Sequence, residues 1–109
     1  MICVVINGPT YQDAHQQIAK AAPYADLVEL RLDGFTTLNF DALKTLRLHF
    51  PIPMIFTLRS KLQGGSYAKS EENHLEDIRK LASLKPEYLD LENHLPKDFI
   101  AEISKHTEI

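Results

Sequence analysis

The stretch VELRLD at residues 28–33 alternates apolar and charged side chains within what otherwise has the composition of a buried β-strand. Successive residues of a strand point to opposite faces of its sheet, so Glu29, Arg31 and Asp33 are expected on one face. The three aliphatic residues of the stretch face the other way, where they can pack against helices. The stretch therefore predicts a two-faced strand, with one apolar face and one charged face.

A short strand followed by a longer helix recurs along the whole chain. Runs rich in β-branched, aromatic and aliphatic residues predict four strands, at residues 2–6, 27–32, 54–59 and 88–92. Apolar residues at helical spacing predict four helices, at residues 13–22, 39–50, 70–85 and from 96 onward, with Asn39 and Ser70 as the N-caps of the second and third. The strand starts lie about 25 to 35 residues apart, the usual length of one β/α unit. The chain is therefore predicted to be a single α/β domain of four β/α units, either an open flavodoxin-like sheet or part of an eight-stranded barrel.

Polar side chains also occupy one face of the third and fourth predicted strands. Thr57 and Arg59 share a face of the third strand, as Asp90 and Glu92 do in the fourth. A parallel sheet in an α/β protein is covered by helices, so a charged face belongs at a barrel mouth or in the crevice at the carboxyl ends of the strands. Two interpretations stay open here: a site for an anionic or polyhydroxylated ligand, or an ion network with a structural role.

Composition and charge argue against several other classes of function. The 109 residues carry 12 basic and 15 acidic side chains, for a formal net charge of −3, so neither a nucleic-acid nor a membrane partner is expected. The opening apolar run is too short for a signal peptide or a membrane span, and the glycine motifs of nucleotide-binding folds are absent. Cys3 is expected to be a buried packing residue in a reducing, cytoplasmic setting. The histidines show no metal-ligand spacing, so no metal site is predicted.

Three motifs resemble the N-terminal half of type I 3-dehydroquinate dehydratase, in that family's order and spacing. They are ADLVELRLD at residues 25–33, FTLRSKLQGGSY at 56–67 and EYLDLE at 87–92. The resemblance covers essentially all 109 residues and implies the N-terminal half of a (β/α)8 TIM barrel. It also implies a lyase of the shikimate pathway, in aromatic amino acid biosynthesis. Such an enzyme converts 3-dehydroquinate to 3-dehydroshikimate and water through a Schiff base on a lysine, without a cofactor. The GGSY sequence is most similar to relatives in which the dehydratase is fused to a shikimate dehydrogenase.

The resemblance also assigns roles to individual residues. Glu29, Arg31 and Arg59 match positions that contact the substrate 3-dehydroquinate, where they would bind its hydroxyl groups and carboxylate. Further candidates near the same face are Asp33, Gln63, Asp90, Glu92 and His94. Gln63 stands where the family commonly has a glutamate, so an amide replaces a carboxylate there. Val5 stands near a position where some members have a substrate-contacting serine, and that contact is not carried over.

The family's two reacting residues are expected outside this chain. Its catalytic histidine lies at the fifth strand and its imine-forming lysine on a later one, whereas the sequence ends at Ile109 after four β/α units. The lysines present fall on predicted helices or in loops, where a solvated role is expected. The chain is therefore expected to bind substrate and to be inactive alone.

The exposed edges of a half barrel predict self-association or a homodimer, which could complete a barrel without supplying the two reacting residues. The alternative is a stand-alone β/α module that binds an anionic metabolite or a protein partner without catalysis.

Overall fold

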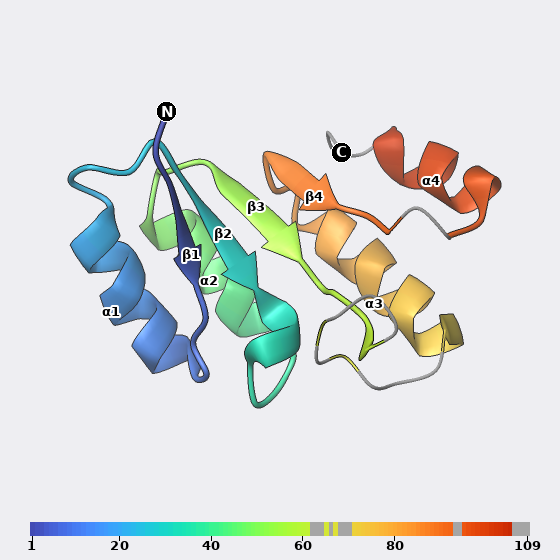
Figure 1. The fold of residues 1–109 in the computed structure, drawn as a ribbon, viewed down its shortest axis with the longest axis horizontal. Coiled ribbons are helices and arrows are strands. Elements are labelled where there is room, and N and C mark those ends of the chain that lie inside the picture. Colours follow the sequence, from blue (N-terminus) through green and yellow to red (C-terminus); the bar gives the residue numbers. More distant parts are fainter. Residues whose placement is uncertain (62–64, 66, 68–70, 93–94, 106–109) are drawn as a thin grey trace.

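The structure is a computed structural model that describes residues 1–61, 65, 67, 71–92 and 95–105. Strands and helices alternate along the chain (Figure 1). The strands are β1 (Cys3–Ile6), β2 (Leu27–Arg31), β3 (Met54–Thr57) and β4 (Tyr88–Asp90). The helices are α1 (Tyr11–Ala21), α2 (Phe40–His49), α3 (Glu71–Ser83) and α4 (Lys97–Ser104), and a 3-10 turn, η1 (Leu32–Gly34), follows β2. The four predicted β/α units are confirmed.

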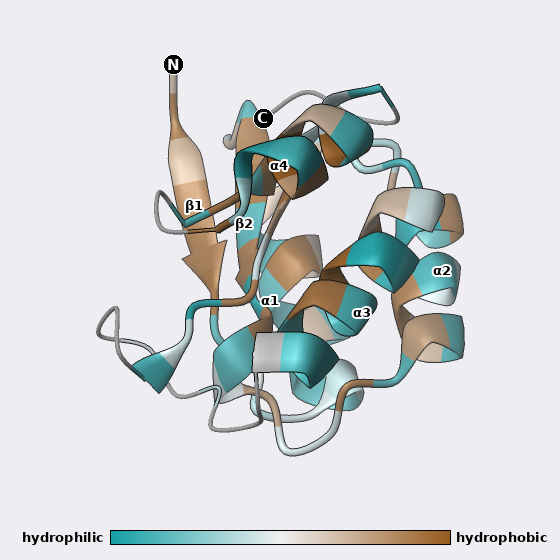
Figure 2. Ribbon diagram, turned by 90° about the vertical axis from the view of Figure 1, so that its right-hand side faces the viewer, coloured by the Kyte–Doolittle hydropathy of each residue, from teal (hydrophilic) through white to brown (hydrophobic). Residues whose placement is uncertain are grey.

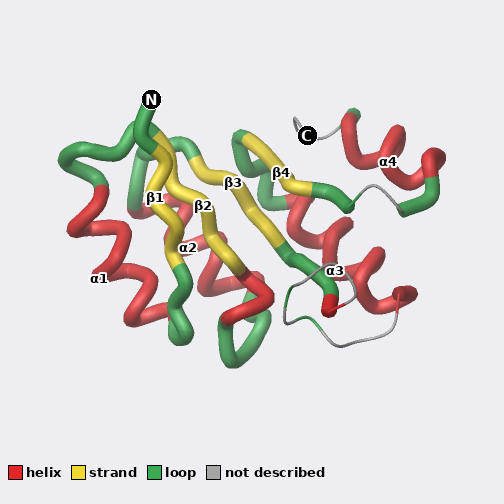
Figure 3. Tube along the Cα trace, in the orientation of Figure 1, coloured by secondary structure: helices red, strands yellow, loops and turns green. Residues whose placement is uncertain are grey.

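The strands form one parallel sheet in the order β1-β2-β3-β4, which the tube in Figure 3 shows side by side. Each strand therefore pairs with its neighbour in the sequence. A flavodoxin-like sheet would instead place the first strand between the second and the third. The consecutive order is the one found in a (β/α)8 barrel, so it decides between the two arrangements that the sequence left open.

The described helices α1, α2 and α3 cover one face of the sheet. Figure 2 views the molecule from the side and shows β1 and β2 on one side and α1, α2 and α3 on the other. Leu30 and Phe56 point into the layer between sheet and helices, and both are fully buried. The helices contribute the other half of this core, chiefly through Ala14, Ile18, Leu43, Leu46, Ile78 and Leu81. The apolar face predicted for VELRLD is confirmed.

No described helix covers the opposite face at β1, and this corrects the prediction for Cys3. Cys3 was expected to be buried, but it is exposed. It lies on the edge strand β1, where alternate residues point away from the helices, and Val5 on the same face is 47% exposed. Tyr88 of β4 is also exposed, at 39%. An apolar run therefore identified the strand correctly but could not show which of its faces is covered.

Three of the four strands end one or two residues earlier than predicted, and this affects the site. β2, β3 and β4 stop at residues 31, 57 and 90, so Asp33, Arg59 and Glu92 stand in the segments that follow them. Leu32 nevertheless stays buried, because the 3-10 turn η1 keeps it against the core. Loops at the carboxyl ends of parallel strands are where such folds carry their ligand sites.

Side-chain caps decide where the first two helices begin. Thr10 Oγ1 accepts a hydrogen bond from the Asp13 backbone N over 3.1 Å, so α1 begins two residues before its predicted start. Asn39 Oδ1 accepts from the Ala42 backbone N over 3.0 Å, which confirms the predicted cap of α2. Ser70, the predicted cap of α3, lies outside the described residues. In the part of the chain that the structure describes, no helix is long and apolar enough to cross a membrane.

Candidate functional site

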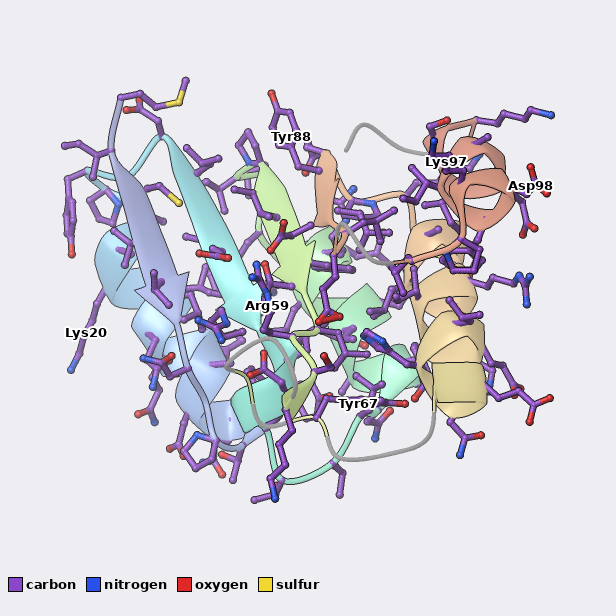
Figure 4. The ribbon with its side chains drawn as sticks, turned by 45° about the vertical axis from the view of Figure 1, so that its right-hand side comes forward. Lys20, Arg59, Tyr67, Tyr88, Lys97 and Asp98 are labelled. Atoms are coloured by element: carbon purple, nitrogen blue, oxygen red, sulfur yellow. The ribbon has the colours of Figure 1, made fainter. Side chains whose placement is uncertain are left out.

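Polar residues from three neighbouring strands meet at one edge of the sheet. The six that are described and were singled out from the sequence are Glu29, Arg31, Asp33, Arg59, Asp90 and Glu92. Figure 4 shows Arg59 at the carboxyl end of the sheet, and Tyr88 at the opposite end. The carboxyl end of the sheet is therefore the candidate functional site.

Glu29 binds the neighbouring strand through Thr57. Thr57 Oγ1 donates a hydrogen bond to Glu29 Oε2 over 2.6 Å, and Thr57 is only 1% exposed. The bond satisfies a buried hydroxyl and fixes the direction of the carboxylate. An ionised carboxylate offers about four lone-pair sites, so Glu29 can accept further hydrogen bonds from ligand hydroxyl groups.

Asp33 links the ends of β2 and β3. Arg31 Nε and Nη2 each donate to the Asp33 carboxylate over 3.3 Å, and the Arg59 backbone N donates to Asp33 Oδ1 over 3.3 Å. The Asp33 side chain is 4% exposed, whereas that of Arg31 is 34% exposed. The buried Asp33 carboxylate therefore binds the Arg31 guanidinium and the Arg59 backbone. The Arg31 guanidinium stays partly accessible to a ligand.

Arg59 forms an ion pair with Asp90 on the adjacent strand, through its Nη2 atom. Both side chains remain about a third exposed, at 35% and 36%. A guanidinium carries five N–H donors in a fixed fork, so an ion pair with one carboxylate is compatible with a second contact to a ligand. A structural ion network and a ligand site, the two interpretations of the sequence, are therefore compatible at this edge.

Glu92 differs from the other carboxylates because it is buried. Its side chain is 3% exposed, and its Oε1 accepts hydrogen bonds from Ser60 N over 3.3 Å and from Ser60 Oγ over 2.5 Å. Ser60 directly follows Arg59, so Glu92 holds the segment that carries this arginine. Its burial makes it a support for the site rather than a part of the exposed surface.

The structure adds three residues that the sequence reasoning missed. His74 on α3 is 3% exposed and lies with Nε2 2.8 Å from the Leu58 carbonyl oxygen. The Tyr67 ring packs against His74, and the Tyr67 hydroxyl donates to Asp77 Oδ2 over 2.6 Å. Burial, and then the bond to Asp77, raises the pKa of the Tyr67 phenol above its usual range. The available signal was spacing, because His74 precedes Ile78 and Leu81 by four and seven residues, on the apolar stripe of α3.

Gly65 lets the loop after β3 pack closely against Arg59. Gly65 N donates to the Ser60 carbonyl over 2.8 Å, and Tyr67 N donates to the Arg59 carbonyl over 3.1 Å. A Cβ atom on residue 65 would lie 2.1 Å from the Arg59 carbonyl oxygen, so a larger residue would displace the loop. Gln63 and His94, which the sequence also singled out, lie outside the described residues.

The described groups can bind and orient a ligand. Arg31 and Arg59 can donate to a carboxylate or to hydroxyl oxygens, and Glu29 can accept from hydroxyl groups. Among the residues that the structure describes, no group of three or more His, Cys, Asp or Glu side chains is arranged to hold a metal ion. This chemistry fits a small anionic, hydroxylated molecule.

Comparison with known proteins agrees with this chemistry. The model of the family described as type I 3-dehydroquinase matches residues 2–108. The bifunctional 3-dehydroquinate dehydratase/shikimate dehydrogenase of Arabidopsis thaliana chloroplasts is 41% identical over 106 residues, which are 94% of this chain and 17% of that protein. The 3-dehydroquinate dehydratase of Pyrococcus abyssi is 33% identical over 106 residues, which are 96% of this chain and 47% of that protein.

A solved structure shows the same fold. The type I 3-dehydroquinate dehydratase of Clostridium difficile, crystallised with covalently modified comenic acid, superimposes with a TM-score of 0.85 at 25% sequence identity. The superposition covers 96% of this chain and 45% of that one. The chain therefore spans less than half of the length of each of these relatives.

Proposed function

Because the chain belongs to the type I 3-dehydroquinase family, we propose that it is the substrate-binding half of a 3-dehydroquinate dehydratase of the shikimate pathway. Its four β/α units have the arrangement of about half of the family's (β/α)8 barrel. The observation that carries the proposal is the position of three residues on neighbouring strands: Arg31 ends β2, Arg59 follows β3, and Glu29 bonds to Thr57, the last residue of β3.

In the proposed site the two arginines bind and orient the anionic substrate. Arg31 and Arg59 donate to its carboxylate and hydroxyl oxygens, while Glu29 accepts from a hydroxyl group. The bonds from Asp33 and Asp90 hold the two guanidiniums in place before the substrate arrives, so less side-chain entropy is lost on binding. Proton removal and imine formation belong to a histidine and a lysine that the family carries after its fourth strand. The 109 residues alone therefore bind substrate without turnover.

Titration of the 109-residue chain with 3-dehydroquinate tests whether the chain binds this substrate at the proposed site. We expect amide NMR signals to shift at the carboxyl ends of β2 and β3, including those of Arg31 and Arg59. The amides of Leu27 and Tyr88, at the opposite ends of their strands, should stay in place. An absence of shifts, or shifts centred elsewhere, would reject the proposed site.

Reduction with borohydride in the presence of 3-dehydroquinate tests whether any lysine of this chain forms an imine with the substrate. An imine traps as a stable secondary amine, which mass spectrometry detects as an added mass on the chain. We expect no adduct, because an imine-forming lysine needs a desolvated site, and no lysine lies in a described strand. A covalent adduct on the 109-residue chain would contradict the proposal that the reacting lysine lies elsewhere.

We also propose that the open face of the sheet drives self-association of this chain. In the described structure β1 and β4 are edge strands, and Val5 and Tyr88 expose apolar surface on that face. Analytical ultracentrifugation should show a sedimentation coefficient that rises with protein concentration. Val5→Lys should weaken this dependence, whereas Leu48→Lys, at a residue on α2 that is 79% exposed, should not. A monomer at all concentrations would contradict the proposal.

A further inference from the structure

Two buried side chains, His74 and Glu92, make polar contacts with the residues before and after Arg59. Before it, the Leu58 carbonyl oxygen lies 2.8 Å from His74 Nε2. After it, Ser60 N and Oγ both donate to Glu92 Oε1. His74 and Glu92 in turn face each other, with 3.7 Å between Nδ1 and Oε2. Together they form a clamp, defined here as the His74–Glu92 pair with its bonds to residues 58 and 60.

The contact with Leu58 decides which nitrogen of His74 must carry a proton. A carbonyl oxygen only accepts hydrogen bonds, so Nε2 must donate. A neutral imidazole has a single N–H, and in that form Nδ1 would present a lone pair to Glu92. Turning the ring by half a rotation would place carbon atoms opposite both oxygens and lose both interactions.

The neutral form of His74 would leave an unfavourable arrangement in a buried place. The side chains of His74 and Glu92 are 4% and 3% exposed, so water does not screen them. Among the described residues, Glu92 Oε2 has no hydrogen-bond partner. A lone pair facing this buried carboxylate oxygen would be repulsive, whereas a proton on Nδ1 turns the contact into an ion pair.

The bonds from Ser60 place this second proton on the histidine rather than on the carboxylate. The 2.5 Å distance from Ser60 Oγ to Glu92 Oε1 is in the range of hydrogen bonds from a hydroxyl group to an ionised carboxylate. The Ser60 backbone N donates to the same oxygen, so Oε1 accepts two hydrogen bonds from Ser60.

The other titratable groups around His74 do not replace Glu92 as its partner. The Tyr67 ring, from the loop after β3, stacks on the imidazole with 4.9 Å between the ring centres. Its hydroxyl group keeps its proton and donates to Asp77, which lies on α3 three residues after His74. Of the carboxylates described here, Glu92 is the one in ion-pair contact with the ring.

We propose that His74 is an imidazolium at neutral pH and that its second proton holds Glu92, and through Glu92 the Arg59–Ser60 segment, in the position for binding substrate. His74 is thus a positioning residue that acts on Arg59 from α3 through Glu92, in the segment that follows β4. The inference rests on the proposed function, because Arg59 needs positioning only if it binds the substrate.

The protonation of His74 can be observed directly. A ring-nitrogen NMR spectrum of the 109-residue chain at about pH 7 should show both nitrogens of His74 protonated. Its signals are assigned by their loss in His74→Gln, while His15→Gln, at an exposed residue of α1, serves as the matched control. A spectrum in which His74 carries a proton on Nε2 alone would overturn the proposal.

Hydrogen exchange tests the effect of the clamp on the Arg59 segment. Protection factors correct for the intrinsic pH dependence of exchange, and His74→Gln should lower that of the Ser60 amide about tenfold, relative to Ile6 in β1. Unchanged protection in His74→Gln, or a loss equal to that of Ile6, would contradict a positioning role.

Glu92→Gln removes the charge that calls for a proton on His74 Nδ1 but keeps the size and shape of the side chain at residue 92. The amide oxygen of glutamine can still accept from Ser60, and its NH2 group can donate to Nδ1 of a neutral His74. We expect this variant to keep its Ser60 protection while its ring-nitrogen spectrum shows His74 protonated on Nε2 alone. A Glu92→Gln variant in which His74 still carries both ring protons would overturn the proposal.

None of these measurements requires a ligand. A doubly protonated His74 and a protected Ser60 amide, in a chain that fails to bind 3-dehydroquinate, would reject the proposed function and leave the clamp intact. Binding of 3-dehydroquinate by a chain whose His74 is neutral would reject the clamp and leave the proposed function intact.

Discussion

Replacing Leu30 by alanine is expected to lower the free energy of unfolding by about 2–5 kcal/mol. Leu30 is fully buried, at the centre of the apolar face of β2. The substitution removes three carbon atoms from a packed layer and leaves a cavity that the sheet and the helices cannot close. Because domains of this size are stable by only about 5–15 kcal/mol, the loss is a large part of the total.

Urea denaturation followed by circular dichroism measures this effect. Leu48→Ala is the matched control, since the same side chain on α2 is 79% exposed and its removal should change the midpoint little. Equal midpoints for the two variants would contradict the buried position of Leu30. The comparison also tests whether the VELRLD strand has one apolar face, which is the basis of the fold prediction.

Replacing Arg59 by glutamine is expected to weaken binding of 3-dehydroquinate by about 10 to 100-fold. This range corresponds to the loss of a charge-assisted hydrogen bond, about 1.5–3 kcal/mol. Arg59→Lys should also bind more weakly, because an ammonium group cannot reproduce the planar fork of the guanidinium. Isothermal titration calorimetry on the 109-residue chain measures the affinity.

Arg79→Gln is the matched control for Arg59→Gln. Arg79 also pairs with a carboxylate, that of Glu102, but it lies on α3 at the contact with α4 and is about half exposed. Its replacement removes the same charge without touching the carboxyl ends of the strands. Equal losses of affinity in both variants would mean that net charge, and not the position of Arg59, determines binding.

The alternation within VELRLD was sufficient to predict the two faces of β2. The strand period is a property of the backbone, so the placement of Leu30 inside and Glu29 outside follows from local geometry alone. The repeated β/α pattern likewise predicted the order of the elements. What the pattern could not decide was the order of the strands within the sheet, because both arrangements use the same β/α units.

Cys3 shows the limit of local reasoning about burial. The run of apolar residues around it predicts a strand but carries no information on what covers either side of it. Cys3 is exposed because β1 is an edge strand whose second face meets no helix. Glu92 shows the opposite case, since a charged residue predicted on the open face is buried against Ser60 and His74.

The sequence by itself determined the β/α units, the apolar faces of β2, β3 and β4 and the charged residues toward their carboxyl ends. These features depend on backbone period and on residue type, which are local. Only the tertiary structure decided the consecutive strand order, the open face of the sheet and the clamp around Arg59. His74 and Glu92 are 18 residues apart in the sequence, and their meeting depends on how α3 lies against the segment that follows β4.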